Sequence, residues 1–419
     1  MRTNGMLLAA AMAMVGAVTA FAQQQPVDPA RTPGVQAGAD PNRAAFLMAN
    51  CKNPAPTPAP AARGGGAAAA PAAGAPAAGA PAAGRAAGGG AAAPGGAAAP
   101  AAAGGARAGG APAGPAEYAV AAIPNVIAAG QRWRVLWEDS GNNADSPIGV
   151  EDGVIVAQNS KSQVLKVGLN GQVTLLATDT FTGGALAMTQ DGKLYVGQRA
   201  LNRGIWQLQP QRRLFTNTKD GEPLECLGQG VLNDMVADSK GGIYMTMGGV
   251  YYTNPQGVTS GRYGTVGGNG LILSPDGRTL YVTGRLMGGM PPAETNDAIV
   301  KFLAAALPAN PMPMPGNGGL VAFDVNQTDG SLSNERQFAW AGGDGTAVDN
   351  AGRLYSTGNG GTWVINTNGS IAGFIPGPRG MISVAFGGPN KRTLFGVSIN
   401  PVQIFAINTQ AQGIQSRPK

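Results

Sequence analysis

The sequence predicts an all-β protein in which residues 117–419 form a six-bladed β-propeller. Short apolar runs alternate with Gly, Asn and Asp turns and show little helical periodicity. A unit of strand, turn and second strand recurs six times, with its turn positions 39, 49, 36, 75 and 38 residues apart. One propeller blade needs about 40–50 residues, whereas a β-sandwich is expected to lack such a fixed repeat.

The six copies share an apolar strand, a turn and a second strand. They are IGVEDGVIVAQ (148–158), LAMTQDGKLYVG (186–197), MVADSKGGIYMT (235–246), LILSPDGRTLYVT (271–283), TAVDNAGRLYST (346–357) and VAFGGPNKRTLFGVS (384–398). Arg132–Glu138 and Val402–Ile407 also have the composition of strands. We expect these two segments to close the ring by sharing one blade, which deletion of Val402–Lys419 would test through loss of folding. The longest gap contains an insertion, Arg285–Asn317, that we expect to be a surface loop.

The first 116 residues differ from the propeller in composition. Residues 1–22 are typical of a cleaved signal peptide, with Arg2, an apolar run over Met6–Phe21 and an A-x-A site at Ala20–Ala22. The run is too short for a comfortable transmembrane anchor. Residues 23–116 form an Ala/Pro/Gly-rich linker for which we expect disorder. Together these features predict export, to the periplasm or outside the cell.

Two features of this linker connect it to the propeller. The apolar island Arg43–Lys52 is predicted to form a short helix that could dock on the domain or on a partner. Cys51 and Cys226 are the two cysteines of the chain, and export would allow a disulfide between them. The sequence leaves their pairing open.

Composition excludes several classes of function. Seven of the 29 basic residues but only two of the 23 acidic ones precede residue 117, so the predicted propeller is nearly neutral. This balance argues against nucleic acid as a partner. The chain contains no histidine, which excludes a Ser-His-Asp triad, an imidazole general base and His-ligated zinc. With only two cysteines, any metal must be held by oxygen ligands.

Polar residues recur at one offset in the repeat, eight residues before each turn. The six ring positions, as we call them, are Asp145, Gly184, Asn233, Asn269, Asp344 and Ile382. Each begins an inner strand, and in a propeller those starts converge on the central channel at one face. Two carboxylates and two amides would suit a hard divalent cation such as Ca²⁺ or Mg²⁺. The alternative is that these residues only cap turns.

Blade geometry predicts which loops stand over this site. The second strand of each blade returns to the ligand face, so Met247–Arg262 and the insertion Arg285–Asn317 should lie above it. Tyr251, Tyr252 and Arg285 are therefore candidate substrate contacts, and a plain surface role is the alternative for each. Glu225 precedes Asn233 by eight residues and either supports the site or is simply exposed.

Four ordered segments of the sequence resemble the senescence-marker-protein/gluconolactonase family of six-bladed propellers. They are VLNDMVADSKGGIYMT, GNGLILSPDGRTLYVT, GGDGTAVDNAGRLYST and SVAFGGPNKRTLFGVS, and the resemblance extends over about residues 140–407. It implies one divalent cation at the channel mouth, first of all Ca²⁺, with Mg²⁺, Mn²⁺ or Zn²⁺ as alternatives. It also implies a hydrolase of sugar lactones or, in relatives, of organophosphates.

The resemblance assigns roles to the ring positions. Asn269 and Asp344 match metal-binding residues, Asp344 also matches the proposed base, and Asn233 matches a residue that contacts substrate or metal. Asp145 stands where the family usually has Glu, so its carboxylate reaches about one methylene less far. Val231 stands where some members have a substrate-binding Arg. This difference argues against an acidic sugar as substrate.

We therefore expect an exported, cation-dependent lactonase that acts on a small molecule. The cation would polarise the lactone carbonyl, and either Asp344 or the ion itself would activate the attacking water. Two alternatives remain open: a non-catalytic propeller that binds a sugar or a protein, and a phosphotriesterase-like hydrolase.

Overall fold

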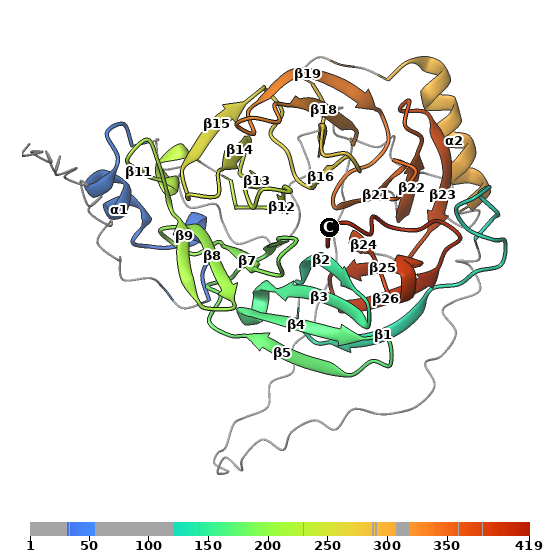
Figure 1. Ribbon diagram of the computed structural model, residues 1–419, viewed down its shortest axis with the longest axis horizontal. Coiled ribbons are helices and arrows are strands. Elements are labelled where there is room, and N and C mark those ends of the chain that lie inside the picture. The colour runs from blue at the N-terminus through green and yellow to red at the C-terminus, as the bar shows by residue number, and fades with distance from the viewer. Residues whose placement is uncertain are drawn as a thin grey trace, which may run out of the picture.

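The computed structural model describes residues 32, 34–54, 120–141, 143–228, 230–286, 289, 291–306, 318–358, 360–378 and 380–419. The predicted signal peptide and most of the predicted linker lie outside the described residues. The strands of the described part form six sheets around a central channel, which confirms the predicted six-bladed propeller (Figure 1).

Five blades each consist of consecutive strands, numbered from the channel outward. Blade 1 is β2 (Asp145–Val150), β3 (Gly153–Gln158), β4 (Gln163–Gly168) and β5 (Val173–Ala177); blade 2 is β6 (Ala185–Met188), β7 (Leu194–Gln198), β8 (Gly204–Gln209) and β9 (Arg213–Thr216). Blade 3 is β12 (Met235–Ala237), β13 (Ile243–Thr246), β14 (Val250–Thr253) and β15 (Thr259–Tyr263), extended by β10 (Thr218–Lys219) and β11 (Glu222–Pro223). Blade 4 is β16 (Leu271–Leu273), β17 (Thr279–Thr283), β18 (Leu320–Val325) and β19 (Leu332–Ala339); blade 5 is β20 (Thr346–Val348), β21 (Leu354–Gly358), β22 (Gly361–Ile365) and β23 (Ile371–Pro376).

Blade 6 closes the ring with strands from distant parts of the sequence. It contains β24 (Met381–Gly387), β25 (Thr393–Ser398) and β26 (Val402–Asn408), and its outer strand is β1 (Arg134–Asp139). β1 pairs antiparallel with β26, so that Arg134 lies opposite Ala406 and Asp139 opposite Val402. The predicted pairing of these two segments is confirmed.

The hydrophobic core lies between neighbouring blades. One cluster joins Tyr195 and Ile205 of blade 2 to Met245 of blade 3, and another joins Val156 of blade 1 to Phe395 of blade 6. Burial of such side chains contributes roughly 1.5–3 kcal/mol each. Since each blade is packed on both sides, the starts of the six inner strands are held at fixed positions around the channel.

The insertion after β17 departs from the expected loop. It contains helix α2 (Ala293–Ala306), which packs against β23, and Ile299 and Leu303 of α2 are buried in the core of blades 3–5. Ile299 and Leu303 are four residues apart and therefore face the same side of the helix. Figure 1 shows α2 at the outer edge of the propeller, away from the channel.

Part of the predicted linker is folded onto blades 2 and 3. After the short helix η1 (Ala37–Ala39), helix α1 (Arg43–Asn50) confirms the predicted helix, and Phe46 and Leu47 are buried. A disulfide joins Cys51 to Cys226 in the short helix η4 (Leu224–Leu227). Two other short helices, η3 (Asn159–Lys161) and η5 (Pro389–Lys391), follow β3 and β24.

Candidate active site at the channel mouth

Asn233, Asn269 and Asp344 make equivalent backbone hydrogen bonds in blades 3, 4 and 5. The backbone N–H of Asn233 donates to the carbonyl of Thr246 over 2.8 Å, that of Asn269 to Thr283 over 3.2 Å, and that of Asp344 to Thr357 over 3.1 Å. In each case the acceptor ends or nearly ends the second strand of the same blade. This repeated bond brings these three side chains to the same end of the channel, where Asp145 begins the inner strand of blade 1.

Asp145 is the first residue of β2 and is 9% exposed. One carboxylate oxygen accepts a hydrogen bond from the N–H of Ser146 over 2.6 Å, and the other lies 3.6 Å from Nη2 of Arg199. Burial is the largest effect on this carboxyl and, with repulsion from Asp234, raises its pKa to about 6, although Arg199 opposes the change. Asp145 is therefore a carboxylate at which negative charge is disfavoured.

Asp344 and Asn269 have side-chain oxygens without a hydrogen-bond donor among the described residues. The only hydrogen bond at Asn269 that involves a side chain uses its backbone carbonyl, which accepts from the hydroxyl of Thr246. Burial raises the pKa of Asp344 well above its usual value, and the charges of Asp145 and Asp234 raise it further. In the metal-free protein, the negative charge of Asp344 is therefore disfavoured, and either a proton or a nearby cation would stabilise this carboxyl group.

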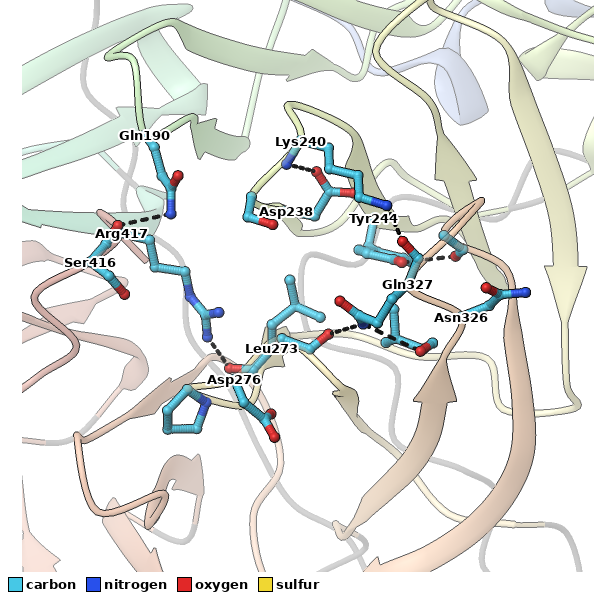
Figure 2. Close-up of a pocket in the computed structure, with 15 residues that line it drawn as sticks. Gln190, Asp238, Lys240, Tyr244, Leu273, Asp276, Asn326, Gln327, Ser416 and Arg417 are labelled. Carbon is cyan, nitrogen blue, oxygen red and sulfur yellow. Dashed lines mark hydrogen bonds between the residues drawn. The ribbon is translucent and has the colours of Figure 1, made fainter.

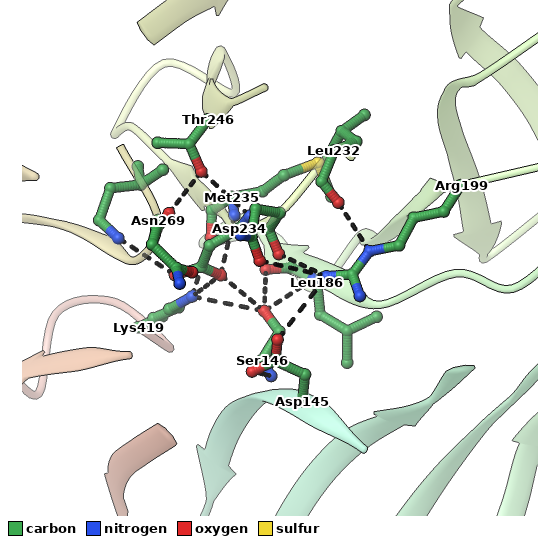
Figure 3. Close-up of polar contacts among 12 residues, drawn as sticks. Asp145, Ser146, Leu186, Arg199, Leu232, Asp234, Met235, Thr246, Asn269 and Lys419 are labelled. Atoms are coloured by element: carbon green, nitrogen blue, oxygen red, sulfur yellow. Dashed lines mark hydrogen bonds and ion pairs between the residues drawn. The ribbon is translucent and has the colours of Figure 1, made fainter. Parts of the chain in front are cut away.

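Arg199 is a member of this site that the sequence analysis missed. It follows β7 and is 5% exposed. Its Nε donates to the carbonyl of Leu232 over 2.9 Å, and its Nη2 donates to the carbonyl of Asn233 over 2.8 Å (Figure 3). The available signal was Gly184, the one ring position without a side chain, because the guanidinium occupies the space beside it.

Asp234 lies directly beneath the ring and was also missed. Its carboxylate accepts hydrogen bonds from the hydroxyl of Ser146 (2.7 Å), the backbone N–H groups of Met235 (2.9 Å) and Leu271 (3.2 Å), and Nζ of Lys419 (2.5 Å). These partners come from blades 1, 3 and 4 and from the C-terminal segment. Asp234 therefore joins parts of the fold to one another and has little capacity left for a ligand.

The C-terminal segment reaches Asp234 from the opposite end of the channel. The side chain of Gln190 donates to the carbonyl of Ser416 over 3.0 Å, and Arg417 donates to the carbonyl of Ser274 over 2.8 Å. Gln190 and Ser274 follow the inner strands β6 and β16 at the far end. A cavity of about 80 Å³ lies beside Arg417 and is lined by the hairpin turns of that end. Figure 2 shows Asp238, Lys240 and Asp276 among the side chains that line it.

The structure does not bring the predicted aromatic contacts into the site. The segment Met247–Arg262 contains β14 and most of β15, so it forms the outer hairpin of blade 3 rather than a loop above the channel. Tyr251 and Tyr252 belong to β14, are 4% and 3% exposed, and lie in two different core clusters. The hydroxyl of Tyr252 donates to Asp238 over 2.7 Å.

Arg285 lies on the rim of blade 4. Its Nε donates to the carbonyl of Gly318 over 2.9 Å, and its guanidinium is 5.9 Å from the ring of Trp340. Glu225 is fully buried and pairs with Arg43 of α1 and with Arg203, each Nε–carboxylate distance being 2.8 Å. Glu225 thus anchors α1 to the propeller.

The ring residues fit a hard divalent cation by donor type. Asp145, Asp344, Asn233 and Asn269 offer carboxylate and amide oxygens, which such ions prefer. The unpartnered oxygens of Asp344 and Asn269 and the repulsion between Asp344 and Asp145 are the features that a cation would satisfy. In the part of the chain that the structure describes, no group of three or more His, Cys, Asp and Glu side chains is arranged for a metal. Amide oxygens and water would therefore have to complete the ligand set.

Part of the chain matches a known protein family. Residues 316–400 match the model of the family described as SMP-30/Gluconolactonase/LRE-like region. The chain resembles this family. The predicted resemblance is confirmed, and the matched region includes Asp344 among the candidate site residues.

Solved structures support the same fold. A gluconolactonase from Xanthomonas campestris is 21% identical, with 71% of this chain and 98% of that chain covered and a TM-score of 0.53. A putative gluconolactonase is 18% identical, with 70% and 99% covered and a TM-score of 0.54. At these identities the likenesses show a shared propeller fold.

A curated relative matches over a shorter stretch. Lactonase drp35 of Staphylococcus epidermidis is 33% identical over 118 residues, which are 24% of this chain and 34% of that protein. The alignment therefore spans about a third of the length of the curated relative. Among the residues that the structure describes, no helix is both long and apolar enough to cross a membrane.

Proposed function

We propose that this protein is a divalent-cation-dependent hydrolase that opens lactones. The observation that supports it best is the pair of unpartnered oxygen side chains, Asp344 and Asn269, beside the buried Asp145 at the channel mouth. The match to the SMP-30/gluconolactonase family and the partial match to a lactonase agree with this reaction class.

Asp145, Asn269 and Asp344 would hold the cation, with Asn233 beside them. Such an ion supplies Lewis-acid chemistry, which draws electron density from a carbonyl oxygen. Ca²⁺ is the first candidate because the donors are all oxygens, and Mg²⁺, Mn²⁺ and Zn²⁺ are alternatives.

Asp344 is the proposed general base. Its carboxylate takes one proton from a water molecule whose oxygen attacks the lactone carbonyl carbon. When the ring C–O bond breaks, the leaving oxygen takes that proton, so the product is the open hydroxy acid and Asp344 is regenerated. In the metal-free protein, burial and the charges of Asp145 and Asp234 raise the pKa of Asp344, and a bound cation would lower that pKa again.

We also propose that the protein is exported. The predicted leader supports this, and so does the disulfide between Cys51 and Cys226, since disulfides persist in oxidising compartments. Expression of the full chain in a bacterium with a periplasm, followed by fractionation and N-terminal sequencing, tests it. A periplasmic product that begins at Gln23 is expected, and a cytoplasmic product that retains residues 1–22 would contradict export.

The hydrolase is tested on the purified full chain by elemental mass spectrometry and by turnover on a panel of aldonolactones and simple γ-lactones. We expect about one divalent ion per chain and turnover that chelation abolishes and ion addition restores. A bound ion without turnover on the lactones or on phosphotriesters would instead support a binding propeller. No ion, and none taken up from Ca²⁺, Mg²⁺, Mn²⁺ or Zn²⁺, would remove the proposed site.

A further inference from the structure

Arg199 occupies the ring position of blade 2. A Cβ added to Gly184 would lie 2.2 Å from Cζ of Arg199 and 2.3 Å from its Nη1, so even alanine would collide with the guanidinium. Gly184 does not have a left-handed backbone conformation, and space rather than backbone freedom therefore explains the glycine. Blade 2 thus contributes a cation to a ring in which blades 1 and 5 contribute carboxylates.

Two of the three guanidinium nitrogens are used by the protein. Nε and Nη2 donate to the carbonyls of Leu232 and Asn233, which fixes the plane of the group. Nη1 donates to no acceptor among the described residues, and it is not among their fully buried unpartnered atoms. Nη1 therefore retains some exposure to solvent although the residue is 5% exposed.

Arg203, four residues further along, shows what a purely structural arginine looks like in this protein. Its Nε donates to Glu225 over 2.8 Å and its Nη2 donates to the other oxygen of the same carboxylate, in a closed bidentate pair. Arg199 instead lies 3.6 Å from Asp145, beyond ordinary hydrogen-bond distance. Nη1 has no acceptor among the described residues in either arginine, but that of Arg203 is fully buried, whereas that of Arg199 is not.

The backbone holds Arg199 in place before any ligand arrives. The N–H of Arg199 donates to the carbonyl of Phe181 over 3.1 Å, and its carbonyl accepts from the N–H of Ala37 over 2.8 Å. Ala37 belongs to the segment that continues into α1 and the disulfide at Cys51. A guanidinium ordered in advance loses little entropy when it binds an oxygen.

We propose that Arg199 binds an anionic oxygen of the substrate, so that the site prefers lactones carrying a carboxylate beside the ring ester. This reverses the expectation drawn from Val231, because Arg199 supplies from blade 2 a guanidinium that position 231 lacks. This proposal rests on the proposed hydrolase function. Guanidinium groups with free N–H donors bind carboxylates more strongly than neutral oxygens, because both partners are charged. Arg199 therefore selects the substrate, whereas Asp344 acts on the attacking water.

The test uses a matched pair of γ-lactones with either a carboxylate or a primary carboxamide on the ring carbon beside the ester oxygen. Wild-type protein should favour the carboxylate in kcat/KM, and Arg199→Met should remove this preference by about 10- to 100-fold, mainly through KM. Arg199→Lys should retain part of it. Arg336→Met, at an exposed arginine on the outer strand β19, is the matched control and should leave the preference unchanged.

Calorimetry with tetrahydrofuran carboxylate, which has no ester to hydrolyse, separates this inference from the proposed function. Loss of its binding in Arg199→Met would support the inference even if no lactone is turned over. Equal binding of the carboxylate and its carboxamide by wild type would overturn it, and so would a preference that survives Arg199→Met in a folded protein. If Arg199→Met does not fold, Arg199→Lys decides, and an undiminished carboxylate preference in this variant would contradict anion recognition by the guanidinium.

Discussion

The mouth of the channel and the layer directly beneath it contain the same kind of side chain in opposite states. Asp234, in the lower layer, accepts four hydrogen bonds from backbone, serine and lysine donors. Asp344, at the mouth, has a raised pKa and no donor among the described residues. The comparison indicates that a carboxylate with a structural role uses its hydrogen-bond acceptor sites, whereas a carboxylate available for chemistry keeps acceptor sites free.

The largest expected effect follows from removing the charge of Asp344. Asp344→Asn should lower lactone turnover by about 10²–10⁴-fold, the usual contribution of a general base. In metal-free protein, the free energy of unfolding should stay equal or rise, because a disfavoured buried charge is lost. Steady-state kinetics and urea denaturation check both parts. Asp324→Asn, at an exposed carboxylate on β18, is the control, and full turnover in Asp344→Asn would exclude this base.

The second largest expected effect is a loss of unfolding free energy when Asp234 is replaced. Asp234→Asn leaves the buried ammonium of Lys419 without its carboxylate and should cost about 3–5 kcal/mol of unfolding free energy. The double variant Asp234→Asn/Lys419→Met should recover most of this loss. A double-mutant cycle measured by denaturation provides the coupling energy. Additive effects would mean that the pair does not join the C-terminal segment to blade 3.

The pH dependence of stability sharpens the comparison. In metal-free protein, the pKa of Asp145 is about 6 against 3.8 in an unfolded chain, so the folded state binds this proton more tightly. The resulting stabilisation is present below pH 3.8 and is lost as pH rises through about 6, a change of about 3 kcal/mol. Thermal unfolding of wild type and Asp145→Asn across this range measures it. Identical pH profiles for the two proteins would refute the assignment.

The smallest effect should come from the disulfide. In Cys51→Ser/Cys226→Ser, the segment 34–54 should become sensitive to proteolysis, while the propeller remains folded. Because Ala37 holds the backbone of Arg199, binding of the tetrahydrofuran carboxylate should weaken by less than about tenfold. Limited proteolysis and calorimetry measure the two changes. Unchanged proteolysis of the segment would show that the pairing between Arg43 and Glu225 is sufficient to hold α1.

The sequence was most informative where the repeat is regular. Recurrence of the strand, turn and second strand identified the blades, and the residue eight positions before each turn identified the ring, because local hydrogen bonds fix both. Even the ring closure between β1 and β26 could be predicted from strand composition.

Sequence reasoning failed to predict contacts in which a side chain of one blade or segment reaches another blade. Arg199 reaches Asn233 on the next blade, and Lys419 reaches Asp234 through the channel, so no local pattern indicates either contact. Tyr251 and Tyr252 were misplaced because the second strand leads directly into β14 by a tight turn rather than into a long loop. Sequence spacing describes one blade at a time, whereas the selectivity of the site depends on contacts between blades.

The equivalent backbone bonds at the ring positions also make the propeller a modular scaffold. Blades 3, 4 and 5 each present one side chain at an equivalent place, and its identity can change without altering the strand behind it. Blade 6 presents Ile382, whose carbonyl accepts from the N–H of Gly345 over 2.8 Å. A carboxylate introduced there would add a new ligand to an existing frame, so altered metal preference or substrate range is accessible through single substitutions.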